Sequence, residues 1–271
     1  MIQMKKIAVI SDIHGNLEAI QTVLTDIKKR GISDIYCLGD LVTKGSHPNE
    51  CIDLIKSHCQ VVLRGNTDRF ISDDHDESTL KDLAKKRIEW NRHLLTQENL
   101  LYLKSLPFSY EFYMSGQLVR LFHASPLKDD LAISHLDPLS VKRTQFEASP
   151  HTLSQNTADI VLFGHTHYQI MEKLYCRTLI NVGSVGNSLD LIRDPVLDGN
   201  TNETVHAHYL ILEGDVMPSD GAISFQFVSL PYAVHKELND LEMNLEPEEY
   251  RLELEKGLYR DMSRLAGKIK H

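Results

Sequence analysis

The chain has 271 residues, 42% of them hydrophobic, which is enough apolar material for one sizeable core. Its formal net charge of -9 argues against tight binding of long nucleic acid, because such binding depends on lysine and arginine neutralising phosphates. The first apolar run stops at Ile10 and no run approaches the ~20 apolar residues of a membrane span, so neither a signal peptide nor a membrane helix is expected.

The cysteines indicate a reducing environment. There are four, Cys37, Cys51, Cys59 and Cys176, and they form no Cys-x-x-Cys pair. Cys37 lies in a strand-like apolar run and Cys51 in a segment with helical spacing, which favours buried free thiols. Free thiols are typical of reducing compartments, so we expect a cytoplasmic protein.

The first quarter of the chain alternates between strand-like and helix-like patterns. Apolar runs typical of buried strands read "KKIAVISD" (5–12), "DIYCLGD" (34–40) and "QVVLRGN" (60–66). Between them, residues 16–31 have apolar residues at helical spacing, and residues 47–58 carry a proline in the first turn of a predicted helix. This β-α-β-α-β order predicts a parallel sheet with right-handed crossovers.

The rest of the chain predicts a helical insertion and further strands. Residues 78–105 are helix-prone and contain Trp90, which we expect to pack inside the insertion or the core. Further strands are predicted at 117–124, 159–167, 177–184, 207–214 and 222–230. The last four follow one another without long helices, so part of the sheet should be antiparallel. Residues 233–269 are charged and helix-prone, and should pack on the sheet or join two copies of the chain.

Polar side chains of metal-ligand type follow directly on five predicted strands. They are Asp12, His14, Asp40, Asn66, His123, His165 and His167. Ligands of open α/β sheets bind beyond the carboxyl ends of strands, so neighbouring strands would bring these donors together. Carboxylate, imidazole and amide ligands suit manganese, iron or zinc, and the lack of a thiolate argues against a structural zinc. Seven donors exceed the needs of one ion, and a carboxylate can bridge two ions about 3.5–4 Å apart.

Each of these motifs also has an ordinary structural explanation. Gly65-Asn66 is a common turn, and His123 alone would suit a hydrogen-bonded core position. The Asp-x-His and His-x-His pairs are expected to place two donors on one side of an extended segment. Taken together, in order and each after a strand, the motifs predict a metal centre.

The ordered motifs D-x-H, G-D, G-N-x-D, H and G-H-x-H resemble those of the calcineurin-like metallophosphoesterase superfamily, over residues 6 to about 190. The helical insertion is similar to the small cap of the bacterial branch that hydrolyses diadenosine polyphosphates, and the chain looks close to the asymmetric diadenosine tetraphosphate hydrolase type. The resemblance implies an α/β fold, a two-sheet β-sandwich flanked by helices. We expect one domain over 1–271, a cap at about 74–108 and a C-terminal helical segment at about 233–269.

The resemblance also implies a ligand set and a reaction. The first metal would take Asp12, His14, Asp40 and His167, and the second Asp40, Asn66, His123 and His165. Hydrolysis would proceed by in-line attack of a hydroxide that bridges the metals, which would also neutralise charge on the phosphoryl oxygens. Asp40, Asn66 and Asp68 are therefore the expected catalytic residues. Manganese, iron, zinc or a mixed pair all accept these ligands.

Thr67 departs from the commonest family pattern. Many members have a histidine there which, paired with an acidic residue, is thought to protonate the leaving oxygen. The pKa of a threonine hydroxyl is far too high for this, so Asp68 loses its partner. We expect leaving groups that need little protonation, which favours diadenosine polyphosphates or activated diesters over phosphoproteins. The rival explanation is that another histidine fills the gap, namely His47, His75 or His93.

Substrate contacts and competing functions complete the expectations. Lys44, Arg64, Thr67 and Arg69 flank the motifs and are candidates to hold a phosphate, although a surface charge explains each cation equally well. A broad-specificity phosphodiesterase acting on cyclic nucleotides or short nucleic acid is the alternative enzyme. A nuclease of long nucleic acid is disfavoured by the acidic balance. A metal-free interaction scaffold should have lost ligands, whereas all seven positions are filled.

Overall fold

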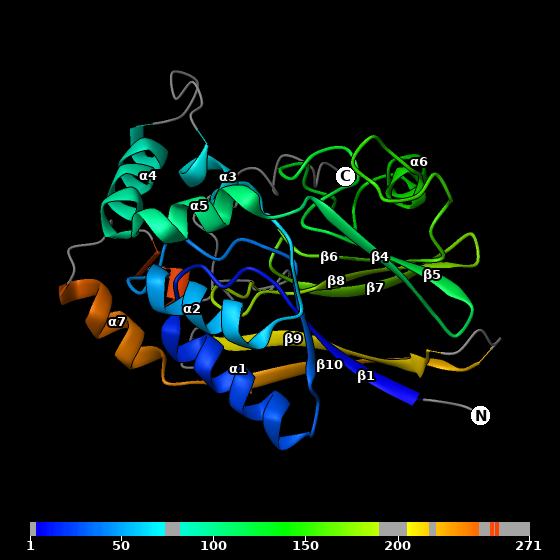
Figure 1. The fold of residues 1–271 in the computed structure, drawn as a ribbon, viewed down its shortest axis with the longest axis horizontal. Helices are drawn as coiled ribbons and strands as arrows, with labels where there is room; N and C mark the ends of the chain where they lie inside the picture. Colours follow the sequence, from blue (N-terminus) through cyan, green and yellow to red (C-terminus); the bar gives the residue numbers. More distant parts are fainter. Residues whose placement is uncertain are drawn as a thin grey trace, which may run out of the picture.

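Two five-stranded sheets pack face to face within the part of the chain that the structure describes (Figure 1). This computed structural model describes residues 4–73, 82–189, 205–216, 221–243, 250, 251, 253 and 254. The first sheet has the order β10-β9-β1-β2-β3 and the second the order β4-β5-β6-β8-β7.

The strand bounds of the first sheet are β1 (Met4–Ile10), β2 (Asp34–Cys37), β3 (Val61–Val62), β9 (His206–Asp215) and β10 (Ile223–Pro231). Those of the second are β4 (Ser109–Met114), β5 (Gln117–Phe122), β6 (Ile160–Phe163), β7 (Gln169–Leu174) and β8 (Arg177–Val182). Both sheets are mixed, because β1-β2, β2-β3, β5-β6 and β6-β8 pair in parallel while β1-β9, β9-β10, β4-β5 and β7-β8 pair antiparallel. This confirms the predicted fold class.

Two strands went unpredicted, and both lie at the edges of the second sheet. β4 reads "SYEFYM" and β7 reads "QIMEKL", so neither offers the continuous apolar run of a buried strand. Edge strands face solvent along one side and need less apolar surface than central strands. The predicted strand at 60–66 is shorter than expected, because only Val61 and Val62 pair with β2.

Helices cover the outer face of the first sheet and one end of the sandwich (Figure 1). The bounds of the described helices are α1 (Leu17–Lys29), α2 (Pro48–His58), α3 (Asn66–Ser72), α4 (Asp82–Leu94), α5 (Gln97–Ser105), α6 (Leu139–Arg143), a 3-10 helix (Thr144–Phe146) and α7 (Val234–Met243). Of these, the 3-10 helix packs on β6 of the second sheet. α4 and α5 fall in the predicted insertion and pack against α2 and α3; Asn49 on α2, for example, donates to the Leu94 carbonyl (2.7 Å). Within the described residues no helix has the length and apolarity needed to cross a membrane.

Strand β1 of the first sheet is buried on both of its faces over residues 7–10. Ala8 and Ile10 face α1 and α2, whereas Ile7 and Val9 face the second sheet. This alternation follows from the two-residue period of a strand and explains the unbroken apolar run of β1. α1 begins where the Asn16 side chain accepts a hydrogen bond from the backbone N–H of Ala19 (3.0 Å), which is a favourable N-cap. The four cysteines carry free thiols, with Cys37 and Cys51 buried as expected.

A buried arginine holds the long loop before β6 against the second sheet. The guanidinium of Arg120 on β5 is fully buried and pairs with Glu111 on β4 at 2.6 Å. Its remaining N–H groups donate to the carbonyls of Phe146, Glu147 and Asn156. One side chain thus satisfies three loop carbonyls, which keeps the loop that leads into β6 in a single conformation.

We predict that Arg120→Met lowers the free energy of unfolding by about 3–5 kcal/mol, because Glu111 would become a buried charge without its cation. Urea unfolding followed by circular dichroism measures this. Arg143→Met is the matched control, since Arg143 is 68% exposed beside Glu147, and its change should stay within about 0.5 kcal/mol. Equal unfolding midpoints for the two variants would contradict the assigned role of Arg120.

Candidate metal centre

The predicted donors gather at one end of the sandwich, where the strands that precede them end. Asp12 and His14 follow β1, Asp40 follows β2, His123 follows β5, and His165 and His167 follow β6. Six of them form two groups whose ligand atoms lie within 4.8 Å of one another. The first group is Asp12, His14 and His167, and the second is Asp40, His123 and His165. Each group therefore draws residues from both sheets.

Asp40 belongs to the second group and also approaches the first. Its Oδ2 is 3.4 Å from Nε2 of His123 in the second group and 3.8 Å from Nε2 of His14 in the first. Asn66, the first residue of α3, joins the second group, with its Oδ1 3.1 Å from His123 Nε2. In the first group Asp12 Oδ1 is 3.2 Å from His167 Nε2. All seven predicted donors thus converge on one place.

The histidine rings are oriented in the way that metal ligands require. Nδ1 of His14, His123 and His167 faces the backbone carbonyls of Val42, Leu38 and Asn187 at 3.2, 3.0 and 2.8 Å, respectively. A carbonyl only accepts, so each Nδ1 carries a proton and each Nε2 is the ring nitrogen that faces the centre; on a neutral ring this nitrogen presents a lone pair.

Two such lone pairs meet in the first group. His14 Nε2 and His167 Nε2 are 3.0 Å apart, and Oδ1 of Asp12 is buried there without a hydrogen-bond partner. Unpartnered acceptors that face one another repel unless a cation or a proton stands among them. The donor set therefore fits a bound metal ion.

The electrostatics of the centre favour cations. Burial opposes ionisation of Asp12 and Asp40, yet the neighbouring histidines outweigh it and hold the pKa of each carboxyl below its usual range. Burial also disfavours the charged form of His123 and so lowers its pKa. The charges of Asp40 and Asp12 outweigh this effect and raise the pKa of His123 to about 10. Burial and the nearby charge of Lys44 hold the pKa of His14 well below its usual value. The two carboxylates therefore attract positive charge to this place.

The predicted extended segments at the metal-ligand motifs were wrong. Asp12, His14, Asp40, His165 and His167 all have left-handed backbones, with φ between 53° and 65°. This region costs non-glycine residues energy, and it persists where the surroundings fix it. The backbone N–H groups of Ile13 and His14 both donate to the carbonyl of Asp40, and that of His165 donates to Asp12 Oδ2. Residues 165 and 167 face different groups as a result.

Two glycines let the loops approach closely enough for the donors to meet. A Cβ on Gly65 would lie 2.1 Å from Asp40 Oδ1, and a Cβ on Gly45 would lie 2.4 Å from the backbone of Gly15. Any larger residue would have to displace the loop that carries Asp40 or His14. Gly65 and Gly45 are therefore required by the close approach of neighbouring loops.

Asp68 lies beneath Asp40 and organises its loop. Its carboxylate accepts hydrogen bonds from the backbone N–H groups of Asp40 (2.8 Å), Leu41 (2.8 Å) and Gly65 (3.0 Å). Burial and the charge of Asp40 raise the pKa of Asp68 to about 7. Both of its oxygens are thus occupied by backbone donors.

Thr67 is built into the same loop. Its backbone N–H donates to Asp40 Oδ1 at 2.9 Å, and its hydroxyl donates to the Val42 carbonyl at 3.1 Å. The hydroxyl proton is therefore directed to the protein backbone. The backbone N–H of Thr67 helps to hold the carboxylate of Asp40 in position.

The cations considered for substrate binding are paired with carboxylates. Arg64 pairs with Asp73 at 3.1 Å, Arg69 binds Asp129 through two nitrogens at 2.7 and 2.9 Å, and buried Lys44 pairs with Glu253 at 3.0 Å. Sequence reasoning missed these acidic partners. Asp129 and Glu253 lie 60 and 209 positions away from the cations that they bind, and no local pattern marks them.

The rival histidines lie in other contacts or outside the described residues. His47 Nε2 is 3.0 Å from Asp240 on α7, and His93 is exposed near the end of α4. His75 lies outside the described residues. Trp90 on α4 is half-buried. None of the described rival histidines belongs to either donor group.

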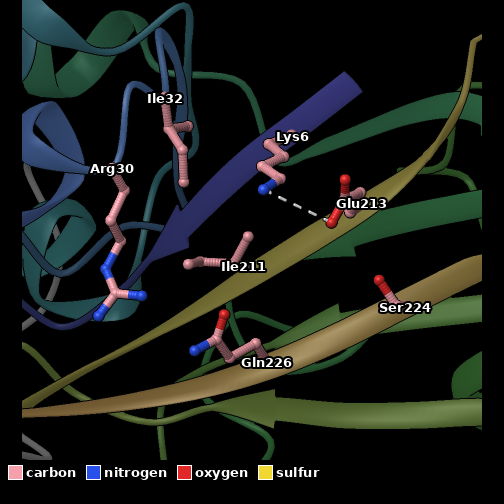
Figure 2. Close-up of a pocket in the computed structure, with 7 residues that line it drawn as sticks. All are labelled: Lys6, Arg30, Ile32, Ile211, Glu213, Ser224 and Gln226. Carbon is pink, nitrogen blue, oxygen red and sulfur yellow. Dashed lines mark ion pairs between the residues drawn. The ribbon is translucent and has the colours of Figure 1, made fainter. Parts of the chain in front are cut away.

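A hollow of about 280 Å³ lies on the first sheet near the start of β1, and Figure 2 shows the residues that line it. It is lined by Lys6, Arg30, Ile32, Ile211, Glu213, Ser224 and Gln226. Lys6 lies near the start of β1, whereas Asp12 follows its end, and the two charges Lys6 and Glu213 already pair at 3.7 Å. The hollow is therefore separate from the donor groups.

Known proteins are similar to this chain in sequence and in fold. The profile of the calcineurin-like phosphoesterase family matches residues 5–169. An uncharacterized protein of Methanocaldococcus jannaschii is 35% identical over 199 residues, which is 68% of this chain and 77% of the relative.

Two solved structures are similar to this chain in fold. A metallophosphoesterase from Sphaerobacter thermophilus has a TM-score of 0.68 at 22% identity, over 94% of this chain and 99% of that chain. A hypothetical protein from Pyrococcus horikoshii has a TM-score of 0.75 at 20% identity, with the same coverage. At this identity the two structures show a shared fold. Since the family profile spans more than half of the sequence and includes all seven donors, the chain belongs to the calcineurin-like phosphoesterase family.

Proposed function

We propose that this chain hydrolyses phosphodiester or phosphoanhydride bonds of small nucleotides with the help of two metal ions, and that diadenosine polyphosphates are its best substrates. The observation that carries the proposal is the orientation of three buried imidazoles. Each donates Nδ1–H to a backbone carbonyl and turns Nε2 towards the carboxylates of Asp12 and Asp40. Such rings are suited to hold cations.

The proposed ligands divide between two ions. Asp12, His14, Asp40 and His167 would hold the first, and Asp40, Asn66, His123 and His165 the second, as manganese, iron or zinc. When bound, the ions would lower the pKa of a water molecule enough for it to attack phosphorus and would neutralise charge on the phosphoryl oxygens. Asp40 Oδ2, which faces both groups, would set the distance between them.

The proposed substrate class follows from Thr67. Its hydroxyl donates to the Val42 carbonyl, so it offers no proton to a leaving group. A nucleotide phosphate that leaves from a phosphoanhydride needs little protonation, whereas an alkoxide needs a full proton. This favours anhydrides and activated diesters as substrates over alkyl phosphomonoesters.

Loss of a proposed ligand should abolish hydrolysis. We expect Asp40→Asn and His165→Ala to reduce Mn²⁺-dependent turnover of diadenosine tetraphosphate by at least about 100-fold, since even residues one shell further out change metal affinity by 10–100-fold. Product chromatography and metal analysis measure turnover and bound ions. His58→Ala, an exposed histidine on α2, is the control and should match the wild type. Full activity in either ligand variant would place the site elsewhere.

The role of Thr67 can be tested by restoring the histidine. In Thr67→His we expect turnover of an alkyl phosphomonoester to rise about 100-fold, the lower range for general acid catalysis, while turnover of diadenosine tetraphosphate changes little. The wild type should prefer the diadenosine substrate. Faster wild-type hydrolysis of the alkyl ester would overturn the proposed substrate class. His93→Ala and His47→Ala test the rival acids, and both should keep wild-type turnover.

Asp68 is expected to act by positioning Asp40. In Asp68→Asn an amide N–H₂ would face backbone N–H groups, so the Asp40 loop should lose at least one hydrogen bond. We expect weaker Mn²⁺ binding by calorimetry together with lower turnover. If turnover falls while Mn²⁺ affinity stays at the wild-type value, Asp68 acts in proton transfer instead.

A further inference from the structure

Part of the C-terminal region is buried against the loops of the metal centre. Tyr250 is fully buried, and its hydroxyl donates to the Gly186 carbonyl at 2.7 Å and accepts from Asn16 Nδ2 at 3.1 Å. Asn16 follows the loop that carries Asp12 and His14, while the backbone N–H of Gly186 donates to the carbonyl of Asp12. Tyr250 thus contacts two loops that adjoin the first donor group.

Glu253 makes the most direct connection to that group. One carboxylate oxygen, Oε2, accepts from Lys44 Nζ at 3.0 Å and from Asn187 Nδ2 at 3.0 Å. The side chains of Lys44 and Glu253 are only 9% and 5% exposed. A buried carboxylate that joins two partners far apart in the sequence fixes both of them in position.

Both partners of Glu253 act on the first donor group. The backbone carbonyl of Asn187 accepts the Nδ1–H of His167 at 2.8 Å. Lys44 follows Thr43, whose hydroxyl is 3.3 Å from His14 Nδ1, and the ammonium of Lys44 shares Glu253 Oε2 with Asn187. A positive charge held next to the first donor group opposes a cation bound there.

We propose that Glu253 is a positioning residue for the first metal ion. Its carboxylate offsets the charge of Lys44 beside a site that must accept a cation, and it holds Asn187, whose carbonyl orients His167. The inference rests on the proposed two-metal function and extends it to a residue outside the span 5–169 that matches the family. Glu253 would then support the metal centre, and its charge would tune metal affinity.

The test measures metal binding without any substrate. Full-length protein is stripped with a chelator and titrated with Mn²⁺ by calorimetry. The wild type should bind two ions. Glu253→Gln keeps the size of the side chain and removes its charge, and we expect one of the two ions to bind about tenfold more weakly, as for other residues that support metal ligands. The second ion should keep its wild-type affinity.

A double variant separates charge from structure. Lys44→Met combined with Glu253→Gln removes both charges, so the local net charge equals that of the wild type. The affinity for Mn²⁺ should therefore return to within about threefold of the wild-type value. Lys44→Met alone should bind the ion more tightly than the wild type. This single variant keeps the test decisive if Glu253→Gln fails to fold.

Glu172→Gln is the matched control, because Glu172 pairs with buried Lys142 at 2.7 Å on β7, away from the donors. It should bind both ions as the wild type does. Unchanged affinity in Glu253→Gln, or no tightening in Lys44→Met, would overturn the role of Glu253 while leaving the proposed function intact. A wild type that binds no Mn²⁺ would overturn both proposals.

Discussion

The burial of two carboxylates, Asp12 and Asp40, at one end of the sandwich is the constraint on which the rest of the centre depends. Burial disfavours their charge, and two such groups close together disfavour it further unless cations stand nearby. His167 Nε2 lies 3.2 Å from Asp12, and His123 Nε2 lies 3.4 Å from Asp40. These imidazoles partly offset the negative charge of the two carboxylates. The centre is therefore organised around positive charge. The left-handed backbones, the three N–H groups that hold Asp68 and the glycine contacts all keep the carboxylates in this arrangement.

The fold class and the convergence of the donors could be predicted because both depend on local patterns. Apolar runs marked most of the strands, and polar residues of ligand type followed five of them in a fixed order. Since strand ends in one layered fold meet at one edge, the order was enough to bring together residues as distant as Asp12 and His167. Edge strands β4 and β7 were missed because an edge needs no continuous apolar run.

The details of the site depended on tertiary contacts that no local pattern records. A spacing of two suggested extended pairs, yet Asp12 and His14 are left-handed, and the backbone N–H groups of Ile13 and His14 donate to the carbonyl of Asp40. Lys44, Arg64 and Arg69 have the right charge and position for phosphate ligands. Their acidic partners, however, come from other segments, as Glu253 does for Lys44. The predicted domain bounds and substrate contacts remain predictions.

The proposed ligands come from both sheets, so metal binding would affect the stability of the fold. In the first group Asp12 and His14 follow β1 while His167 follows β6, and in the second Asp40 follows a strand of the first sheet while His123 and His165 follow strands of the other. An ion bound in either group would link the two sheets at this end of the sandwich. Its binding free energy would then add to the resistance of the sandwich to opening, so that a metal-depleted cell would hold a protein that is less durable as well as less active.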